Sequence, residues 1–167
     1  MPDAPSAPPA YSQVKSPAPD NTWTAIELSA QPLGGSLGAR GGMSGVMVVD
    51  GQQALVHCGG YDEFTSNAFS NDCFALRVSS SGEVVVDSLA PLPQPRRWSC
   101  HGSDGGRLVV AGGLDDNWDR QQSVWVLEGV ALGWAAAAVN LSSARHSSAG
   151  LLLGDHLVCM GGTNEVG

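Results

Sequence analysis

Leu55-Val56-His57-Cys58-Gly59-Gly60 is the first of three similar stretches in this chain of 167 residues. Leu108-Val109-Val110-Ala111-Gly112-Gly113 and Leu157-Val158-Cys159-Met160-Gly161-Gly162 repeat it, at spacings of 53 and 49 residues. A period near 50 is typical of a small structural unit that stacks on copies of itself, because one unit alone cannot bury its apolar faces. The repeat therefore places function on the surface of an array and not in a single catalytic motif.

Each stretch is preceded by an arginine, an apolar strand and a turn. A glycine stands five residues after the arginine in all three units: Arg40/Gly45, Arg97/Gly102 and Arg145/Gly150. The turns contain residues that hairpins need at positive φ: Asp50-Gly51, Asp104-Gly105-Gly106 and Gly154-Asp155. Each unit is therefore expected to begin with a hairpin of two apolar strands.

Two further strands complete each of the first two units. The third strands are expected at Cys73–Leu76 and Val124–Leu127, after polar loops of roughly ten residues, and the fourth at Glu83–Val86 and Gly133–Ala136. Only Ala135–Ala138 favours a helix, and so short a run is too small to nucleate one. The sequence predicts an all-β protein built from units of four antiparallel strands.

This pattern resembles the Kelch repeat. That family's repeat carries an arginine, an aliphatic strand ending in Gly-Gly, an aromatic residue in the third strand and a Trp in the fourth. The second unit has all of these marks, in Arg97, Leu108–Gly113, Trp125 and Trp134. The first unit has Phe74 in the third strand, but a valine run, Val84–Val86, replaces the Trp.

The resemblance covers about residues 22–167 and implies blades of an incomplete β-propeller. We expect blades at about 40–90, 97–141 and, in part, 145–167, with Gly45, Gly102 and Gly150 on the innermost strands and Trp134 in the buried frame. The segment 22–28 is expected to be the outer strand of an earlier blade. Because Kelch propellers have more blades than this, we expect a fragment of a longer protein, a truncated product, or a chain whose open blade ends self-associate.

Residues 1–21 differ in composition from the rest of the chain. Six prolines with Ser and Ala between them cannot form a core, so we expect a disordered leader. It has neither the basic start nor the apolar stretch of a signal peptide. Within it, Pro8-Pro9-Ala10-Tyr11 fits the PPxY pattern that WW domains bind, which makes a WW-domain protein a candidate partner.

The sequence contains no apolar run long enough to cross a membrane, so we expect a cytoplasmic or nuclear protein. The four cysteines fit a reducing compartment, and all four lie within expected strands with no close pair anticipated. Asn140-Leu141-Ser142 has the pattern of a glycosylation sequon, which carries no meaning without secretion. A net charge of −8, with Lys15 as the single lysine, argues against nucleic acid or an anionic membrane as a partner.

The arginines and the loops after the glycine pairs are expected to share one edge of the blades. In a four-stranded antiparallel blade, the start of the first strand, the end of the second, the start of the third and the end of the fourth lie together. Arginines, aromatic residues and carboxylates on a rigid scaffold are typical of protein-binding surfaces. The expected protein-binding residues are Arg40, Tyr61, Asp62, Glu63, Arg96, Arg97, Trp98, Asp115, Asp116, Asn117, Trp118, Arg145, His146, Asn164 and Glu165. For each arginine, the alternative is a structural role, pairing with blade carboxylates.

Signals for an enzyme are poor, so we expect no catalytic residues, no metal site and no cofactor. The four histidines and four cysteines lack the paired spacing of structural zinc ligands. The Kelch resemblance implies a protein-interaction module, as in ubiquitin-ligase substrate adaptors and cytoskeletal scaffolds. The alternative it leaves open is a fragment of a Kelch-fold enzyme, such as one similar to a sialic-acid epimerase.

Overall fold

The structure is a computed structural model that describes residues 12–14, 25–27, 41–62 and 68–164. The chain divides into two compact units, residues 1–34 and 35–167. In the smaller unit, β1 (Ser12–Val14) pairs antiparallel with β2 (Ala25–Glu27), and Gln13 lies opposite Ile26. β1 lies within the segment that we expected to be a leader without structure. Its Ser-Gln-Val sequence contains no proline, so every residue of the strand can donate a backbone hydrogen bond.

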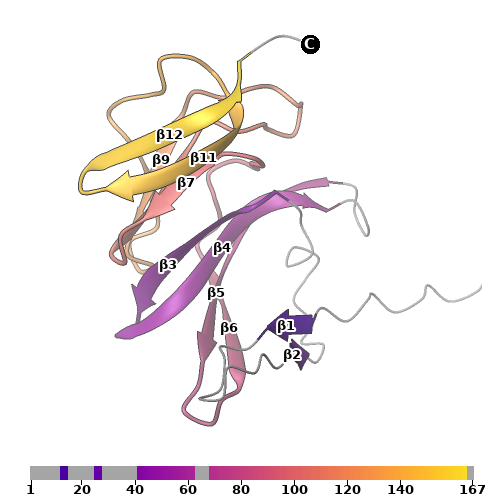
Figure 1. Ribbon diagram of the computed structural model, residues 1–167, viewed down its shortest axis with the longest axis vertical. Coiled ribbons are helices and arrows are strands. Elements are labelled where there is room, and N and C mark those ends of the chain that lie inside the picture. The colour runs from indigo at the N-terminus through magenta and orange to yellow at the C-terminus, as the bar shows by residue number, and fades with distance from the viewer. Residues whose placement is uncertain (1–11, 15–24, 28–40, 63–67, 165–167) are drawn as a thin grey trace, which may run out of the picture. The chain divides into compact units, whose positions relative to one another are not determined.

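The larger unit contains two four-stranded antiparallel sheets and a two-stranded one (Figure 1). The first sheet has the order β3 (Met43–Val49), β4 (Gln52–Asp62), β5 (Ala68–Val78) and β6 (Val84–Leu89). The second consists of β7 (Cys100–Ser103), β8 (Arg107–Ala111), β9 (Val124–Glu128) and β10 (Trp134–Ala136). β11 (His146–Leu153) and β12 (His156–Thr163) form the third. The expectation of an all-β fold with four-stranded blades is confirmed; we call the sheets blades 1, 2 and 3.

The glycine pairs end a strand in only one blade. β8 ends at Ala111, directly before Gly112, whereas β4 and β12 continue through their pairs. In blade 1 the pair coincides with a register shift between Cys58 and Gly60, and both glycines have positive φ. Such a bulge bends a strand without ending it. The first hairpin is therefore longer than expected, and Tyr61 and Asp62 lie on β4 instead of in a loop.

The first strands of the blades pack against one another, with β7 in contact with both β3 and β11. Glycines allow this approach, as expected for the innermost strands. A Cβ added to Gly102 would lie 2.4 Å from the backbone nitrogen of Leu152, and one added to Gly150 would lie 2.3 Å from the carbonyl oxygen of His101. A Cβ on Gly45 would likewise lie 2.7 Å from Ser103 Oγ. Side chains at these positions would hold the blades apart.

The core lies between blades 1 and 2. Met43 and Met47 of β3 are fully buried with Val56 of β4, against Leu108 and Leu127 of blade 2. The aromatic residue that belongs to this core is Trp125, which is 7% exposed. Trp134, which we expected in the buried frame, is only partly buried, and its Nε1 donates a hydrogen bond to the carbonyl of Ala90 at 3.1 Å.

The cysteines are paired, which corrects the expectation that no two would lie close together. Cys58 of β4 lies directly opposite Cys73 of β5 and is bonded to it. Cys100 of β7 is bonded to Cys159 of β12 and so links blade 2 to blade 3. Chain separation misled the prediction, because antiparallel pairing and blade stacking bring together residues that are 15 and 59 positions apart. No helix in the described part of the chain is long and apolar enough to span a membrane.

Candidate protein-interaction face

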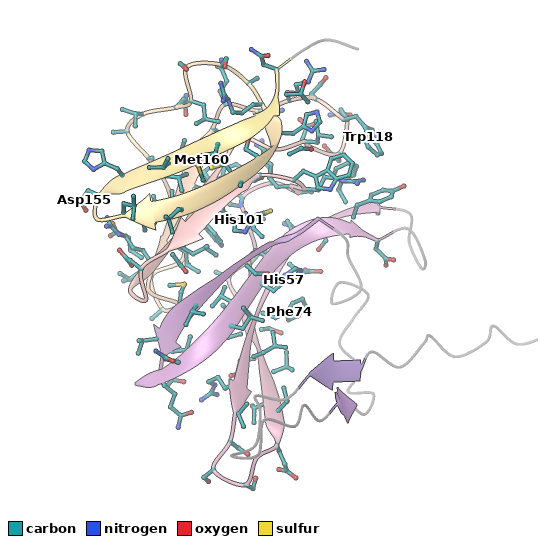
Figure 2. The ribbon with its side chains drawn as sticks, viewed as in Figure 1. His57, Phe74, His101, Trp118, Asp155 and Met160 are labelled. Atoms are coloured by element: carbon teal, nitrogen blue, oxygen red, sulfur yellow. A yellow bond between two sulfur atoms is a disulfide. The ribbon has the colours of Figure 1, made fainter. Side chains whose placement is uncertain are left out.

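The blades present two different ends. One end carries the hairpin turns at Asp50, Asp104 and Asp155, and we call it the turn face. The other end carries the starts of the first strands and the loops after the glycine pairs, and we call it the loop face. Figure 2 shows Trp118 on the loop face, far from Asp155 on the turn face. The antiparallel strand order thus places the candidate binding residues at one end of the blades, as we expected for four-stranded blades.

Backbone hydrogen bonds link equivalent residues of the three blades on the loop face. Gly41, Trp98 and Ser147 precede or begin the first strands, and each has positive φ, at 70°, 55° and 57°. The Trp98 nitrogen donates to the Gly41 carbonyl, and the Ser147 nitrogen donates to the Trp98 carbonyl, both at 2.7 Å. Because Trp98 and Ser147 hold this conformation despite their side chains, the connection between blades is tightly constrained at this end.

This link shows that Arg145 is not equivalent to Arg97. The residue before Ser147 is His146, so His146 occupies the position of Arg97. Arg145 matches Arg96 instead: their carbonyls accept hydrogen bonds from Gly113 and Gly60, at 2.8 Å and 2.7 Å. Counting five residues back from a glycine failed because Gly150 is not equivalent to Gly102. Gly102 lies opposite Val109, three residues before its glycine pair, and in blade 3 the residue in that position is Leu151, opposite Val158.

Arg97 is enclosed by aromatic side chains from two blades. Its guanidinium carbon lies 3.4 Å from the Trp98 ring centroid, 4.9 Å from that of Tyr61 and 5.1 Å from that of Trp118. Only 7% of Arg97 is exposed. Cation–π contacts of this kind contribute about 0.5–2 kcal/mol each, the higher values applying where water is excluded. Arg97 therefore supports the aromatic side chains that surround it, and little of its own side chain is exposed for a partner to contact.

Tyr61, Phe69 and Trp118 form an aromatic cluster on the loop face. Their ring centroids lie 5.2 Å (Tyr61–Phe69), 5.7 Å (Tyr61–Trp118) and 5.1 Å (Phe69–Trp118) apart, all in edge-to-face geometry. Trp118 belongs to blade 2 and is 53% exposed, whereas the other two come from paired positions on β4 and β5 of blade 1. The cluster holds an exposed indole against rigid strands of a neighbouring blade.

The loop that carries Trp118 is organised by a single carboxylate. Asp115 Oδ1 accepts hydrogen bonds from the backbone nitrogens of Asn117 and Asp119, at 3.0 Å and 2.9 Å, and its Oδ2 accepts one from Gln121 Nε2 at 2.6 Å. Trp118 itself has a φ of 65° and donates its backbone N–H to the Asp115 carbonyl. Asp115 therefore shapes the loop, whereas Trp118 and Asp116 project from it as exposed side chains.

His146 extends the stacked groups toward blade 3. Its ring stacks on Trp98, with centroids 5.9 Å apart and planes at 25°, and its Nδ1 shares a 2.8 Å hydrogen bond with Ser147 Oγ. Burial lowers the pKa of His146, and the positive charges of Arg120 and Arg97 lower it further. The positive charges of Arg97 and Arg120 therefore lie close to His146 on the loop face.

Arg96 lies beneath the loop face and not on it. It is 1% exposed, its guanidinium carbon lies 4.5 Å from the Trp125 ring centroid, and its Nη2 donates to Gln94 Oε1 and Ser123 Oγ at 3.0 Å each. Burial lowers the pKa of Arg96 to about 10, against the opposing effect of Asp115 and Asp116. The Arg96 side chain is therefore closed off from solvent, and its bonds go to an amide and a hydroxyl and not to the blade carboxylates that the structural alternative named.

An open pocket of about 600 Å³ adjoins Trp118 between the loops of blades 2 and 3. Arg120, Gln122 and Ser143 contribute to its walls, together with Asn164 after β12. The Nη1 of Arg120 donates to the Asn164 carbonyl at 3.3 Å, so this arginine connects the two loops. Arg145 stands close by and donates to Ser143 Oγ at 2.9 Å.

The structure places the described members of the expected set at one end of the blades, but Asp62, Arg96 and Arg97 are buried there. Phe69 and Arg120 belong to the face but were missed, since Phe69 lies in a stretch that the sequence pattern marked as loop. Extending the two predicted strands past the glycine pair would have placed Phe69 opposite Tyr61. Three expected residues, Arg40, Glu63 and Glu165, lie outside the described residues. Among the residues that are described, no three His, Cys, Asp or Glu side chains are placed to hold a metal ion.

No protein-family model matches the chain, and no curated protein matches its sequence. Among solved structures, a fungal alcohol oxidase of the AA5 family, in complex with copper, matches with a TM-score of 0.62 at 17% identity. The match covers 78% of this chain and 28% of the oxidase chain, so this chain spans little more than a quarter of that structure's length. An identity this low shows a shared fold alone. The chain has the fold of Kelch-type β-propeller blades in an open, incomplete array.

Proposed function

We propose that the chain is a protein-recognition module whose contact surface is the loop face. The observation that carries this proposal is the position of Trp118, a large aromatic side chain that is 53% exposed yet supported by Tyr61, Phe69 and Arg97. Exposed tryptophans on a preformed surface are typical binding hot spots, because little side-chain freedom is lost when a partner covers them.

The surroundings of Trp118 support the same proposal. Trp98, 37% exposed, and the pocket beside Arg120 extend the surface across blades 2 and 3. Aromatic residues and arginines are enriched at protein interfaces, and here both stand on a scaffold fixed by backbone hydrogen bonds between blades. Recognition of a protein is the part of the Kelch resemblance that this surface supports.

Copper chemistry is not assigned to this chain. The likeness to the alcohol oxidase concerns the fold, and the described residues contain no group of three His, Cys, Asp or Glu side chains that could hold a metal ion.

The test compares two exposed apolar side chains on opposite ends of the blades. Trp118→Ala removes the centre of the loop face, whereas Leu132→Ala removes an equally prominent side chain, 79% exposed, from the turn between β9 and β10 on the turn face. Immobilised wild type is used to isolate binding proteins from native extract, and the affinity of each is then measured for the three chains. Trp118→Ala should weaken binding by about 1–4 kcal/mol while Leu132→Ala leaves it unchanged. Equal binding by Trp118→Ala, with both variants folded, would place recognition elsewhere.

A further inference from the structure

All four cysteines of the sequence are used in disulfides. One bond lies within blade 1, between neighbouring strands, and the other joins two blades. Disulfides form and persist in the secretory route and outside the cell, whereas the cytosol keeps thiols reduced. Two separate pairs with no cysteine left over therefore indicate a chain that folds under oxidising conditions, in contrast to the cytoplasmic or nuclear location expected from the sequence.

The glycosylation sequon can serve as an acceptor in a chain that passes through the oxidising secretory route. Asn140-Leu141-Ser142 is the only Asn-x-Ser or Asn-x-Thr in the sequence, and it lies in the irregular segment between β10 and β11. Leu141 faces inward: its backbone nitrogen donates to the Gln122 carbonyl at 2.9 Å, and its side chain packs near Gly112. Asn140 and Ser142, on either side, are both exposed. The folded chain therefore anchors the middle residue and leaves the acceptor amide and the hydroxyl accessible.

We propose that Asn140 carries an N-linked glycan, added while the chain passes through the secretory route. The donor is a lipid diphosphate-linked oligosaccharide, and the reaction is a glycosyl transfer that needs no oxidant or reductant. Asn140 Nδ2 forms a bond to C1 of the first sugar and loses one proton. The bond between C1 and the diphosphate oxygen breaks, and its electron pair leaves with the lipid diphosphate. Asn-x-Ser sequons on surface loops of secreted proteins are the acceptors of this reaction.

The glycan would stand at the edge of the loop face. Ser142 and Ser143, next along the chain, line the open pocket beside Trp118. A glycan on Asn140 restricts the approach of partners from the blade 3 side and leaves the Tyr61 side open. The inference itself does not depend on protein recognition, because it rests on the disulfides and on the exposure of the sequon.

The first experiment asks whether the site is used. The full chain is expressed in mammalian cells behind a cleavable secretion signal, and the product is treated with peptide N-glycosidase in ¹⁸O water. Wild type should show one downward gel shift and conversion of Asn140 to ¹⁸O-labelled Asp by mass spectrometry. Asn140→Gln and Ser142→Ala should lose the shift, and Ser142→Thr should keep it. Because residue 140 is exposed, Asn140→Gln should melt at the same temperature as the enzyme-treated wild type.

The second experiment asks whether the natural protein meets those conditions. Protein isolated from its own cells under thiol-blocking conditions should take up alkylating reagent at four cysteines only after reduction, and it should show the same enzyme-dependent shift. Full agreement in both experiments supports the inference. It is overturned by an unmodified Asn140 in the secreted chain, by free thiols in the natural protein, or by a natural protein that is oxidised but carries no glycan.

Discussion

Arg97 and Trp118 have opposite roles on the loop face, although both are large and both contact Tyr61 and Phe69. Arg97 is enclosed and holds neighbouring rings in place, whereas Trp118 rests on those rings and exposes about half of its surface. The sequence could indicate that both belong to one face, because the repeat fixes the strand order. It could not separate their roles, since burial depends on Tyr61 and Phe69 reaching across from blade 1.

Because the first strands of the blades lie so close together, replacing Gly102 by Ala should destabilise the protein more than replacing Gly106. Gly102→Ala would place a Cβ 2.4 Å from a backbone atom of Leu152, which can move only with the whole of β11. Gly106→Ala, in the turn after β7, meets nothing closer than 3.6 Å, and Gly106 does not have positive φ. Gly102→Ala should lower the free energy of unfolding by about 1–3 kcal/mol in urea titrations, and Gly106→Ala should change it by less than about 0.5 kcal/mol. Equal effects would mean that the blades are not in close contact at β7.

His57 should make stability depend on pH. Its Nδ1 shares a 2.8 Å hydrogen bond with Ser44 Oγ, and its Nε2 is buried with no hydrogen-bond partner among the described residues. Burial, followed by the charge of His101, lowers the pKa of His57 below the ordinary histidine value of about 6.5. The unfolded chain then binds the proton more readily, so the stabilisation is complete above about pH 6.5 and is lost as pH falls toward the folded pKa.

Urea unfolding at about pH 7.5 and about pH 5.5 measures this dependence. Wild type should have the smaller free energy of unfolding at the lower pH, and His57→Gln, which keeps a group able to bond Ser44, should reduce the difference. His146 contributes in the same direction, because its pKa is lowered too. A difference that His57→Gln leaves intact would assign the effect to other groups.

At the scale of strands and blades, a disulfide and an ion pair join blades 2 and 3. The Cys100–Cys159 disulfide joins β7 to β12, and Arg107 bonds Asp104 and Asp155 across the turn face at 2.8 Å and 2.9 Å. The sequence predicted strands and hairpins well because turn glycines and alternating apolar residues are local signals. It missed the disulfides and the offset of Arg145, because both depend on which residues face each other across paired strands and stacked blades, and no local pattern specifies that.

The two disulfides should differ in their contribution to stability. Replacing Cys100 and Cys159 by Ser opens a link across 59 residues, whereas replacing Cys58 and Cys73 opens one across 15. On the chain-entropy account each pair contributes about 2–5 kcal/mol, and the longer loop contributes about 1 kcal/mol more. Denaturant titrations of the two double variants, without reductant, give the comparison. A smaller loss for the Cys100/Cys159 variant would show that strain or residual structure outweighs loop length.

At the scale of the whole array, the outer side of blade 3 is apolar and uncovered within the described structure. Leu151, Leu153, Val158 and Met160 are 49%, 56%, 38% and 57% exposed on one side of the β11–β12 hairpin. Exposed apolar side chains on a sheet face promote association. The unpartnered face is consistent with the sequence-based expectation that open blade ends self-associate, and this stays a prediction.

Light scattering with purified chain tests that prediction. Wild type should show a mass that rises with concentration, and Leu151→Ser combined with Met160→Ser should lower it toward the monomer. Leu132→Ser, which alters an exposed side chain on the turn face, serves as the control and should behave as wild type. A concentration-independent monomer for wild type would show that the face needs no partner.

The central claim, that the loop face recognises a protein, is tested most directly by oxidative footprinting of the wild-type chain with and without an isolated binding protein. The method reports side-chain exposure without any substitution, and both Trp118 and Leu132 are exposed enough to react in the free chain. We predict that the partner slows oxidation of Trp118 and leaves the oxidation of Leu132 unchanged. Protection of Leu132 with Trp118 still fully reactive would contradict it and would move recognition to the turn face.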